Sequence, residues 1–181
     1  KMKEGQKVAI VTGAGTGVGK AVTQILLQHG YCVALAGRRE ELLHSVVSEA
    51  GADSKSTLCQ QTDVGCEEDV DSLFDATVDR FGRIDVLFNN AGIGARPVDI
   101  DELPLAEWQA VLNTNVHGAY LCARRAFGQM KSQDPKGGRI INNGSISASM
   151  PRVNSTPYTV SKHAMSGLTR SIALDGRPHN I

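Results

Sequence analysis

The chain has 181 residues, 41% of them hydrophobic and 21% charged, and its 19 basic and 19 acidic residues leave no formal net charge. This length fits one domain with a sizeable core, and the composition is that of a soluble globular protein. The balanced charge argues against nucleic acid or an anionic membrane as a partner, and no apolar run approaches the roughly 18 residues that cross a bilayer.

Strand-like and helix-like segments alternate along the chain. We expect strands at 7–12, 31–36, 57–62, 84–88 and 139–142, and helices at 17–29, 39–50, 67–81, 105–130 and 157–174. Short apolar runs are typical of strands that a parallel sheet buries on both faces, and the less apolar third strand is expected near an edge. The five repeats predict a single, doubly wound, Rossmann-like α/β domain over 1–181, with helices on both faces of a parallel sheet.

The ends of the chain and its cysteines bear on compartment and completeness. Lys1–Gly5 contain no apolar leader, and the four cysteines form no C-x-x-C pair and have no histidine at metal-ligand spacing. We therefore expect a cytoplasmic protein with reduced thiols and no metal site. The chain stops at 178–181, directly after a strong helix, so we expect a C-terminal part to be missing.

A glycine-rich turn, T-G-A-G-T-G-V-G at 12–19, joins the first strand to the first helix. Glycines there permit a tight turn, let the backbone approach a pyrophosphate at the helix N-terminus, and allow close helix–strand packing. The spacing differs from G-x-G-x-x-G, and a glycine turn without a ligand is the alternative. The candidate cofactor-binding residues of this turn are Gly13, Thr16, Gly17, Val18 and Gly19.

The second strand ends at Gly37, where an NAD site usually places an acidic residue to hold the ribose 2′-hydroxyl. Arg38 and Arg39 follow, and guanidinium groups favour a 2′-phosphate. We therefore predict NADP(H) rather than NAD(H). The alternative is a solvated helix start in which Glu40 and Glu41 pair with the arginines.

Two more turns complete the expected cofactor site. Asp63 and Val64 follow the third strand; Asp63 either accepts from an adenine amino group or caps the helix at 67–81. Asn90, Ala91 and Gly92 follow the fourth strand. Small residues and amides there suit close approach of the backbone to a ribose and lock the sheet locally, and a bare turn is the alternative.

A second group of residues points to the reacting end of the site. Tyr158 and Lys162 are four residues apart on one expected helix, so the lysine charge can stabilise a phenolate. An ordinary tyrosine ionises only near pH 10, so a phenolate near pH 7 needs roughly 4 kcal/mol of such help. Ser145 follows the fifth strand 13 residues before Tyr158, near enough to share a substrate oxygen. Asn115 lies mid-helix, where an amide competes with the backbone; the alternative is an exposed asparagine, which suits Asn113 better.

These motifs, in this order and over essentially the whole chain, resemble those of the short-chain dehydrogenase/reductase family. The resemblance is to NADP-type members such as 3-oxoacyl-[acyl-carrier-protein] reductases. It implies an NADP(H)-dependent oxidoreductase that transfers a hydride between nicotinamide and a carbonyl or secondary alcohol. It also implies a homodimer or homotetramer, paired through the helices at 105–130 and 157–174.

The resemblance further implies a catalytic tetrad of Asn115, Ser145, Tyr158 and Lys162. Tyr158 would be the general acid in reduction and the general base in oxidation, and Ser145 would hydrogen-bond the reacting oxygen. Lys162 would hold the ribose hydroxyls and favour the ionised form of Tyr158, while Asn115 would support a water that leads protons to Lys162.

The chain departs from the family in two places. Gly144 stands where many members have a serine, which leaves Ser145 the better candidate and Ser147 a distant second. Members of the family usually continue into a sixth strand, a Pro-Gly motif, a substrate-covering segment and a seventh strand, and we expect these to be the part that is missing after Ile181.

Other functions remain open on the sequence. A cofactor-binding sensor without turnover is one alternative to the enzyme, and an inert structural subunit is another. Among substrates, 3-oxoacyl thioesters are our hypothesis beside simple ketones, sugars and polyols. We expect the loops at 93–97 and 150–157 near the reacting centre, where Arg96 and Arg152 either attract an acidic substrate or are merely solvated.

Overall fold

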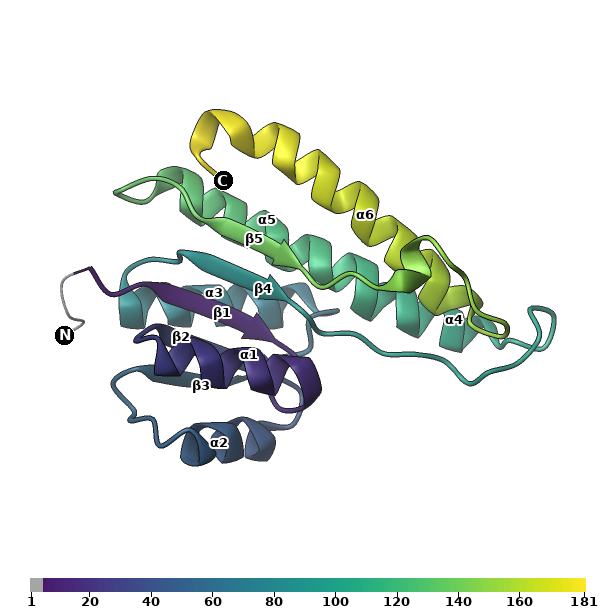
Figure 1. Ribbon diagram of the computed structural model, residues 1–181, viewed down its shortest axis with the longest axis horizontal. Helices are drawn as coiled ribbons and strands as arrows, with labels where there is room; N and C mark the ends of the chain where they lie inside the picture. The colour runs from purple at the N-terminus through teal and green to yellow at the C-terminus, as the bar shows by residue number, and fades with distance from the viewer. Residues whose placement is uncertain (1–4) are drawn as a thin grey trace.

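The computed structural model describes residues 5–181, so Lys1–Glu4, in which we expect no leader, lie outside the described residues. One parallel sheet forms the centre of the molecule, with strand order β3-β2-β1-β4-β5 (Figure 1). Its strands are β1 (Val8–Thr12), β2 (Cys32–Gly37), β3 (Thr57–Gln61), β4 (Val86–Asn89) and β5 (Arg139–Asn142). The less apolar β3 lies at an edge, as predicted.

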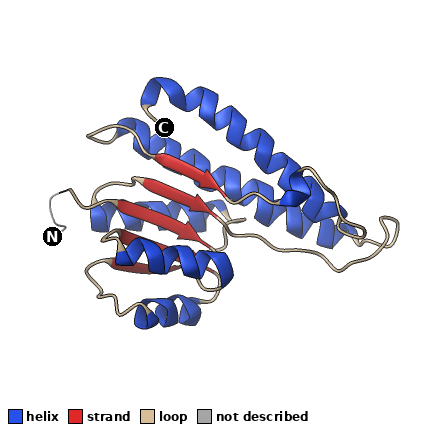
Figure 2. Ribbon diagram, in the orientation of Figure 1, coloured by secondary structure: helices blue, strands red, loops and turns tan. Residues whose placement is uncertain are grey.

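Helices cover both faces of the sheet (Figure 2), which confirms the predicted Rossmann-like arrangement. They are α1 (Gly17–Gln28), α2 (Glu40–Glu49), α3 (Glu67–Phe81), α4 (Leu105–Leu112), α5 (Gly118–Ser132) and α6 (Thr156–Gly176). Helices α1 and α2 pack on one face and α3 and α5 on the other, while α6 packs along α4 beside β5.

The core divides into two layers because neighbouring residues of a strand point to opposite faces. In β1, Ile10 packs with the buried side chains of α3 and α5, and Val11 packs with those of α1 and α2. Every residue of β1 is buried. The apolar run at the start of the chain is therefore a strand covered on both faces, as its composition indicates.

The long helix expected at 105–130 is not regular throughout. A π-helical turn, Asn113–His117, joins α4 to α5, and the amide of Gly118 donates to the carbonyl of Asn113, five residues back. Such a turn holds one more residue than an α-helical turn, and π-turns occur frequently at functional sites. Periodicity alone could not reveal it, since the helix axis continues through the turn.

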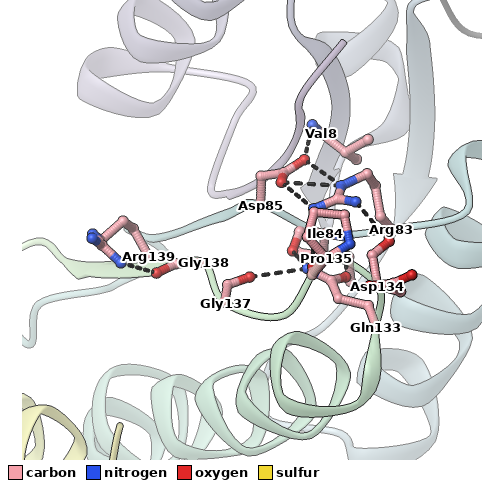
Figure 3. A network of polar contacts seen from close by, with 10 residues as sticks. All are labelled: Val8, Arg83, Ile84, Asp85, Gln133, Asp134, Pro135, Gly137, Gly138 and Arg139. Atoms are coloured by element: carbon pink, nitrogen blue, oxygen red, sulfur yellow. Dashed lines mark hydrogen bonds and ion pairs between the residues drawn. The ribbon is translucent and has the colours of Figure 1, made fainter. Parts of the chain in front are cut away.

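The amino ends of the strands are joined by a polar network at the base of the sheet (Figure 3). The carboxylate of Asp85 accepts from the amide of Val8 at 2.8 Å and from the guanidinium of Arg83 at 2.9 Å. Gln133, at the end of α5, accepts from the amide of Ile84 at 3.0 Å and donates to its carbonyl at 2.8 Å. These bonds fix where β1, β4 and α5 meet, at the end of the sheet opposite the predicted site.

Within residues 5–181, no helix is both long and apolar enough to cross a membrane. The same part of the chain contains no group of three or more His, Cys, Asp or Glu residues that could hold a metal ion.

Replacement of Gln133 tests the network at the base of the sheet. The side chain is 8% exposed and also donates to the carbonyl of Gly137 at 3.0 Å. Gln133→Leu leaves three buried backbone groups unpaired, so we expect the free energy of unfolding of the full-length protein to fall by about 2–4 kcal/mol. Chemical denaturation measures this change. Gln28→Leu, which removes an exposed amide from α1, is the matched control, and equal stability of the two variants would refute the assignment.

Candidate active site

The predicted turns lie together at the carboxyl end of the sheet, because all its strands are parallel and point the same way (Figure 1). A cleft opens at this carboxyl end, beside the turns after β1, β2, β3 and β4. The predicted cofactor residues that line it are Gly13, Thr16, Arg38, Arg39, Asp63, Val64, Ala91 and Gly92.

The glycine turn places its glycines in different roles. Gly13 and Gly17 have positive φ angles of 62° and 52°, which favour glycine. A Cβ added at Gly19 would overlap the carbonyl oxygen of Gly13, so Gly19 lets α1 pack tightly on the turn. A Cβ at Gly17 would meet nothing within 4 Å, so this residue presents bare backbone at the start of α1. Gly17, Gly19 and the exposed Val18 do not line the cleft, and their contact with a cofactor stays a prediction.

Asn90 does not line the cleft, but it ties the end of β4 to the end of β1. The hydroxyl of Thr12 accepts from the amides of Asn90 and Ala91, both at 3.0 Å. The side-chain Nδ2 of Asn90 donates to the carbonyls of Thr12 and Gly13 at 3.0 and 3.3 Å. The segment after β4 is therefore hydrogen-bonded to the end of β1, and its contact with a ribose stays a prediction.

The two arginines after β2 line the cleft. Both are exposed, and within residues 5–181 neither forms an ion pair. Glu40 instead faces His44 at 3.6 Å, so the alternative pairing with Glu40 and Glu41 is not present. The backbone is fixed here because Nε2 of Gln61 donates to the carbonyl of Arg38 at 3.0 Å.

Asp63 does not cap helix α3, which begins four residues later at Glu67 with Cys66 in the capping position. Its Oδ1 accepts from the amide of Gly65 at 2.9 Å and so closes a tight turn. The turn seats Val64 against Gly118, where an added Cβ would lie 2.7 Å from a methyl group of Val64. Asp63 itself stays exposed on the cleft.

Tyr158 and Lys162 lie in the first turns of α6. Lys162 is 8% exposed, and its Nζ lies 5.5 Å from the centroid of the Tyr158 ring. The ammonium donates to the carbonyl of Asn143 at 2.8 Å, and no carboxylate in the described part of the chain pairs with it. The charge is therefore held beside the phenol without being neutralised, and two of its three N–H donors remain for other partners.

Ser145 caps a 3-10 turn, Ile146–Ala148, which packs against α6. Its Oγ accepts from the amide of Ser147 at 3.1 Å. A hydroxyl that accepts in this way keeps its own proton to donate, which suits a substrate oxygen. Ser147 is fully buried, so the second serine that the sequence offered cannot reach a substrate.

Asn115 belongs to the π-helical turn and is 3% exposed, so the exposed-asparagine alternative is wrong for it and fits the exposed Asn113. Its Oδ1 accepts from the amide of Ile93 at 2.8 Å and its Nδ2 donates to the carbonyl of Ile93 at 2.9 Å. The same Nδ2 donates to the hydroxyl of Ser161 at 3.1 Å, and that hydroxyl donates to the carbonyl of Tyr158 at 2.7 Å. Asn115 thus connects the loop after β4 to the helix that carries Tyr158.

A second pocket lies where the two expected substrate loops meet, lined by Gly94, Ala95, Pro97, Arg152, Val153, Asn154, Ser155, Pro157 and Tyr158. Arg96 points its charge elsewhere, since its Nε pairs with Glu107 at 2.8 Å. Of the two arginines considered for an acidic substrate, only Arg152 lines the pocket.

Sequence reasoning missed three residues of this site, which are Thr12, Asn143 and Ser161. Thr12 and Ser161 act through hydrogen bonds that become visible only once separate elements are assembled. Asn143 had a signal, because an Asn-Asn pair ends β5 just as another pair, Asn89-Asn90, ends β4. Two pairs of asparagines at the ends of neighbouring strands predict hydrogen bonds between their side-chain amides.

The chain is similar to known proteins both in sequence and in structure. The model of the short chain dehydrogenase family matches residues 7–181. Secoisolariciresinol dehydrogenase of Forsythia intermedia is 37% identical over 93% of the chain and 60% of its own length. A 3-oxoacyl-[acyl-carrier-protein] reductase of Synechocystis is 36% identical over 92% of the chain and 67% of its own length. The crystal structure of a Brucella melitensis 3-ketoacyl-(acyl-carrier-protein) reductase complexed with NADH superposes with a TM-score of 0.90 at 30% identity, over 95% of this chain and 70% of that one. The chain thus spans about 60–70% of these relatives.

Proposed function

Since the chain belongs to the short-chain dehydrogenase family, we propose that the whole protein is an NADP(H)-dependent oxidoreductase. Its substrate would be a carbonyl compound or a secondary alcohol, with Tyr158 as the general acid and base. The observation that carries this proposal is the placement of Tyr158 beside the buried, un-neutralised ammonium of Lys162. The same tyrosine lines the pocket between the two substrate loops.

The cleft and the glycine turn beside it fit a dinucleotide. The bare backbone at Gly17, which lies outside the cleft lining, suits a pyrophosphate at the N-terminus of α1, while Ala91 and Gly92 in the cleft leave room for a ribose. The unpaired Arg38 and Arg39 suit a 2′-phosphate, which supports NADP(H) over NAD(H). When bound, the nicotinamide supplies the hydride chemistry.

The protein residues would manage the oxygen and its proton. Ser145 would donate a hydrogen bond to the substrate oxygen, and Tyr158 would give that oxygen a proton in reduction or take one in oxidation. The ammonium of Lys162 would favour the phenolate and hold the ribose hydroxyls. Asn115 would support a water that leads protons to Lys162.

We further propose a 3-oxoacyl thioester as the substrate. The similarity to the Synechocystis and Brucella reductases supports this choice, and Arg152 offers a positive charge at the pocket for an acidic acyl carrier. We also propose a cytoplasmic location, which the four unpaired cysteines support.

Replacement of Tyr158 tests the reaction. Tyr158→Phe removes only the hydroxyl, so we expect kcat to fall by about 10²–10⁴-fold, the range of general acid catalysis, with NADPH affinity retained. NADPH absorbance, followed with the full-length protein over thioesters, ketones and sugars, measures the rate. Tyr31→Phe is the matched control, because Tyr31 directly precedes β2, at the end of the sheet opposite the site. NADPH binding without turnover in the wild type would point to a sensor, and neither binding nor turnover to a structural subunit.

Replacement of Arg38 tests the cofactor preference. Loss of a charge-assisted hydrogen bond removes about 1.5–3 kcal/mol, so Arg38→Ala should weaken NADPH binding about 10- to 100-fold. NADH lacks the 2′-phosphate, and its affinity should stay unchanged. Calorimetric titration with both nucleotides measures the two affinities, with Arg96→Ala as the control. An equal loss for both would contradict the assignment.

Self-association is proposed through the apolar groove between α4, α5 and α6. It is lined by Trp108, Leu112, Val116, Tyr120, Val160 and Leu168, among others. A second copy of the chain would cover these side chains as a homodimer or homotetramer. We expect light scattering of the full-length protein to give a multiple of the monomer mass. Val160→Glu should lower that mass, because it buries a charge in the contact, whereas Val153→Glu on the exposed loop should not. A monomeric wild type would refute the proposal.

A further inference from the structure

The carboxyl ends of β4 and β5 carry two parallel amide contacts. The strands pair in register at Asn89 and Asn142, and the side-chain Nδ2 of Asn89 donates to Oδ1 of Asn142 at 3.1 Å. One residue further, where side chains point to the opposite face, Nδ2 of Asn143 donates to Oδ1 of Asn90 at 2.9 Å. The backbone is joined as well, since the amide of Asn143 donates to the carbonyl of Asn89 at 2.9 Å.

The first contact leads to the helices of one face. Asn89 also donates to the carbonyl of Ala119 in α5, and Asn142 donates to the hydroxyl of Thr169 in α6. This chain of bonds reaches neither the cleft nor Lys162.

The second contact leads to the site. Because Nδ2 of Asn90 is committed to the carbonyls of Thr12 and Gly13, its Oδ1 faces Asn143 and needs a donor. Asn143 supplies that donor from its side chain, while its own carbonyl accepts from the ammonium of Lys162 at 2.8 Å. One residue therefore contacts both the support of the glycine turn and the buried lysine.

We propose that Asn143 is a positioning residue, which fixes where Lys162 lies relative to the glycine turn. The hydrogen bonds that do so run from Gly13 through Asn90 and Asn143 to Lys162. The inference rests on the function proposed above, in which Lys162 acts on Tyr158 and on the cofactor. Within residues 5–181 the carbonyl of Asn143 is the hydrogen-bond acceptor that the protein offers to this ammonium. A shift of Asn143 therefore moves the lysine charge relative to both the phenol and the cleft.

Two substitutions separate the hydrogen bond from packing. Asn143→Asp keeps the shape of the side chain but has no donor for Asn90, and Asn143→Leu removes the donor without adding a charge. Asn142→Leu is the matched control, because it breaks the neighbouring amide contact at the same end of the same strand without touching Lys162.

Two measurements on the full-length protein report the effect. One is fluorescence titration with NADPH, in which both Asn143 variants should bind about three- to tenfold more weakly, the size of one neutral hydrogen bond. The other is the steady-state reduction of a 3-oxoacyl thioester at saturating NADPH. We expect both variants to lower kcat about three- to tenfold with KM for the thioester unchanged, because Lys162 acts on the reacting groups and not on substrate binding.

The control decides between positioning and general loosening. Asn142→Leu should leave kcat and the NADPH affinity at wild-type values. The proposal is overturned if both Asn143 variants keep the wild-type kcat and affinity, or if Asn142→Leu changes them equally. The NADPH titration needs no turnover, so a wild type that binds NADPH without turning over would refute the proposed function and still leave the role of Asn143 decided.

Discussion

The clamp between Thr12 and Asn90 is the interaction on which the site depends. Adjacent parallel strands bring their carboxyl ends together, but they do not by themselves fix the loops that follow. The hydroxyl of Thr12 holds the backbone after β4, and the side chain of Asn90 holds the backbone after β1, so each strand end fastens the other. The clamp therefore fixes the distance between the loops that follow β1 and β4. A ligand that contacts both loops binds to a site that is already formed.

The two ends of the sheet use polar groups differently. At the base, Asp85 and Gln133 direct every hydrogen bond inward, onto backbone and a neighbouring guanidinium, which serves stability (Figure 3). At the carboxyl edge, Lys162 keeps unused donors, Ser145 accepts a bond and so retains its proton, and Arg38 has no ion partner within the described residues. A site that acts on a ligand has to leave such groups available, so this difference between the two ends supports the proposed function.

The sequence was informative wherever one segment determines its own structure. Apolar runs predicted the strands, glycines marked the helix ends, and the spacing of Tyr158 and Lys162 placed both on one helix. It was insufficient where two distant segments act together. The π-helical turn leaves the helical pattern unbroken, and the burial of Asn115 depends on the loop at Ile93. The contact of Lys162 is with a backbone carbonyl, which carries no sequence signal, and the contact between Asn90 and Asn143 requires the register of β4 and β5.

The strand order also governs the sequence of events as the chain leaves the ribosome. Strand β1 can pair with β2 early, but its other edge waits for β4, whose residue Phe88 pairs with Val11. Until then, a strand buried on both faces in the finished protein has an open hydrogen-bonding edge, the kind of surface through which nascent chains aggregate. The glycine turn cannot acquire its support from Asn90 before that moment either. The half of the fold that carries the glycine turn therefore matures late, when the second half of the sheet has begun to form.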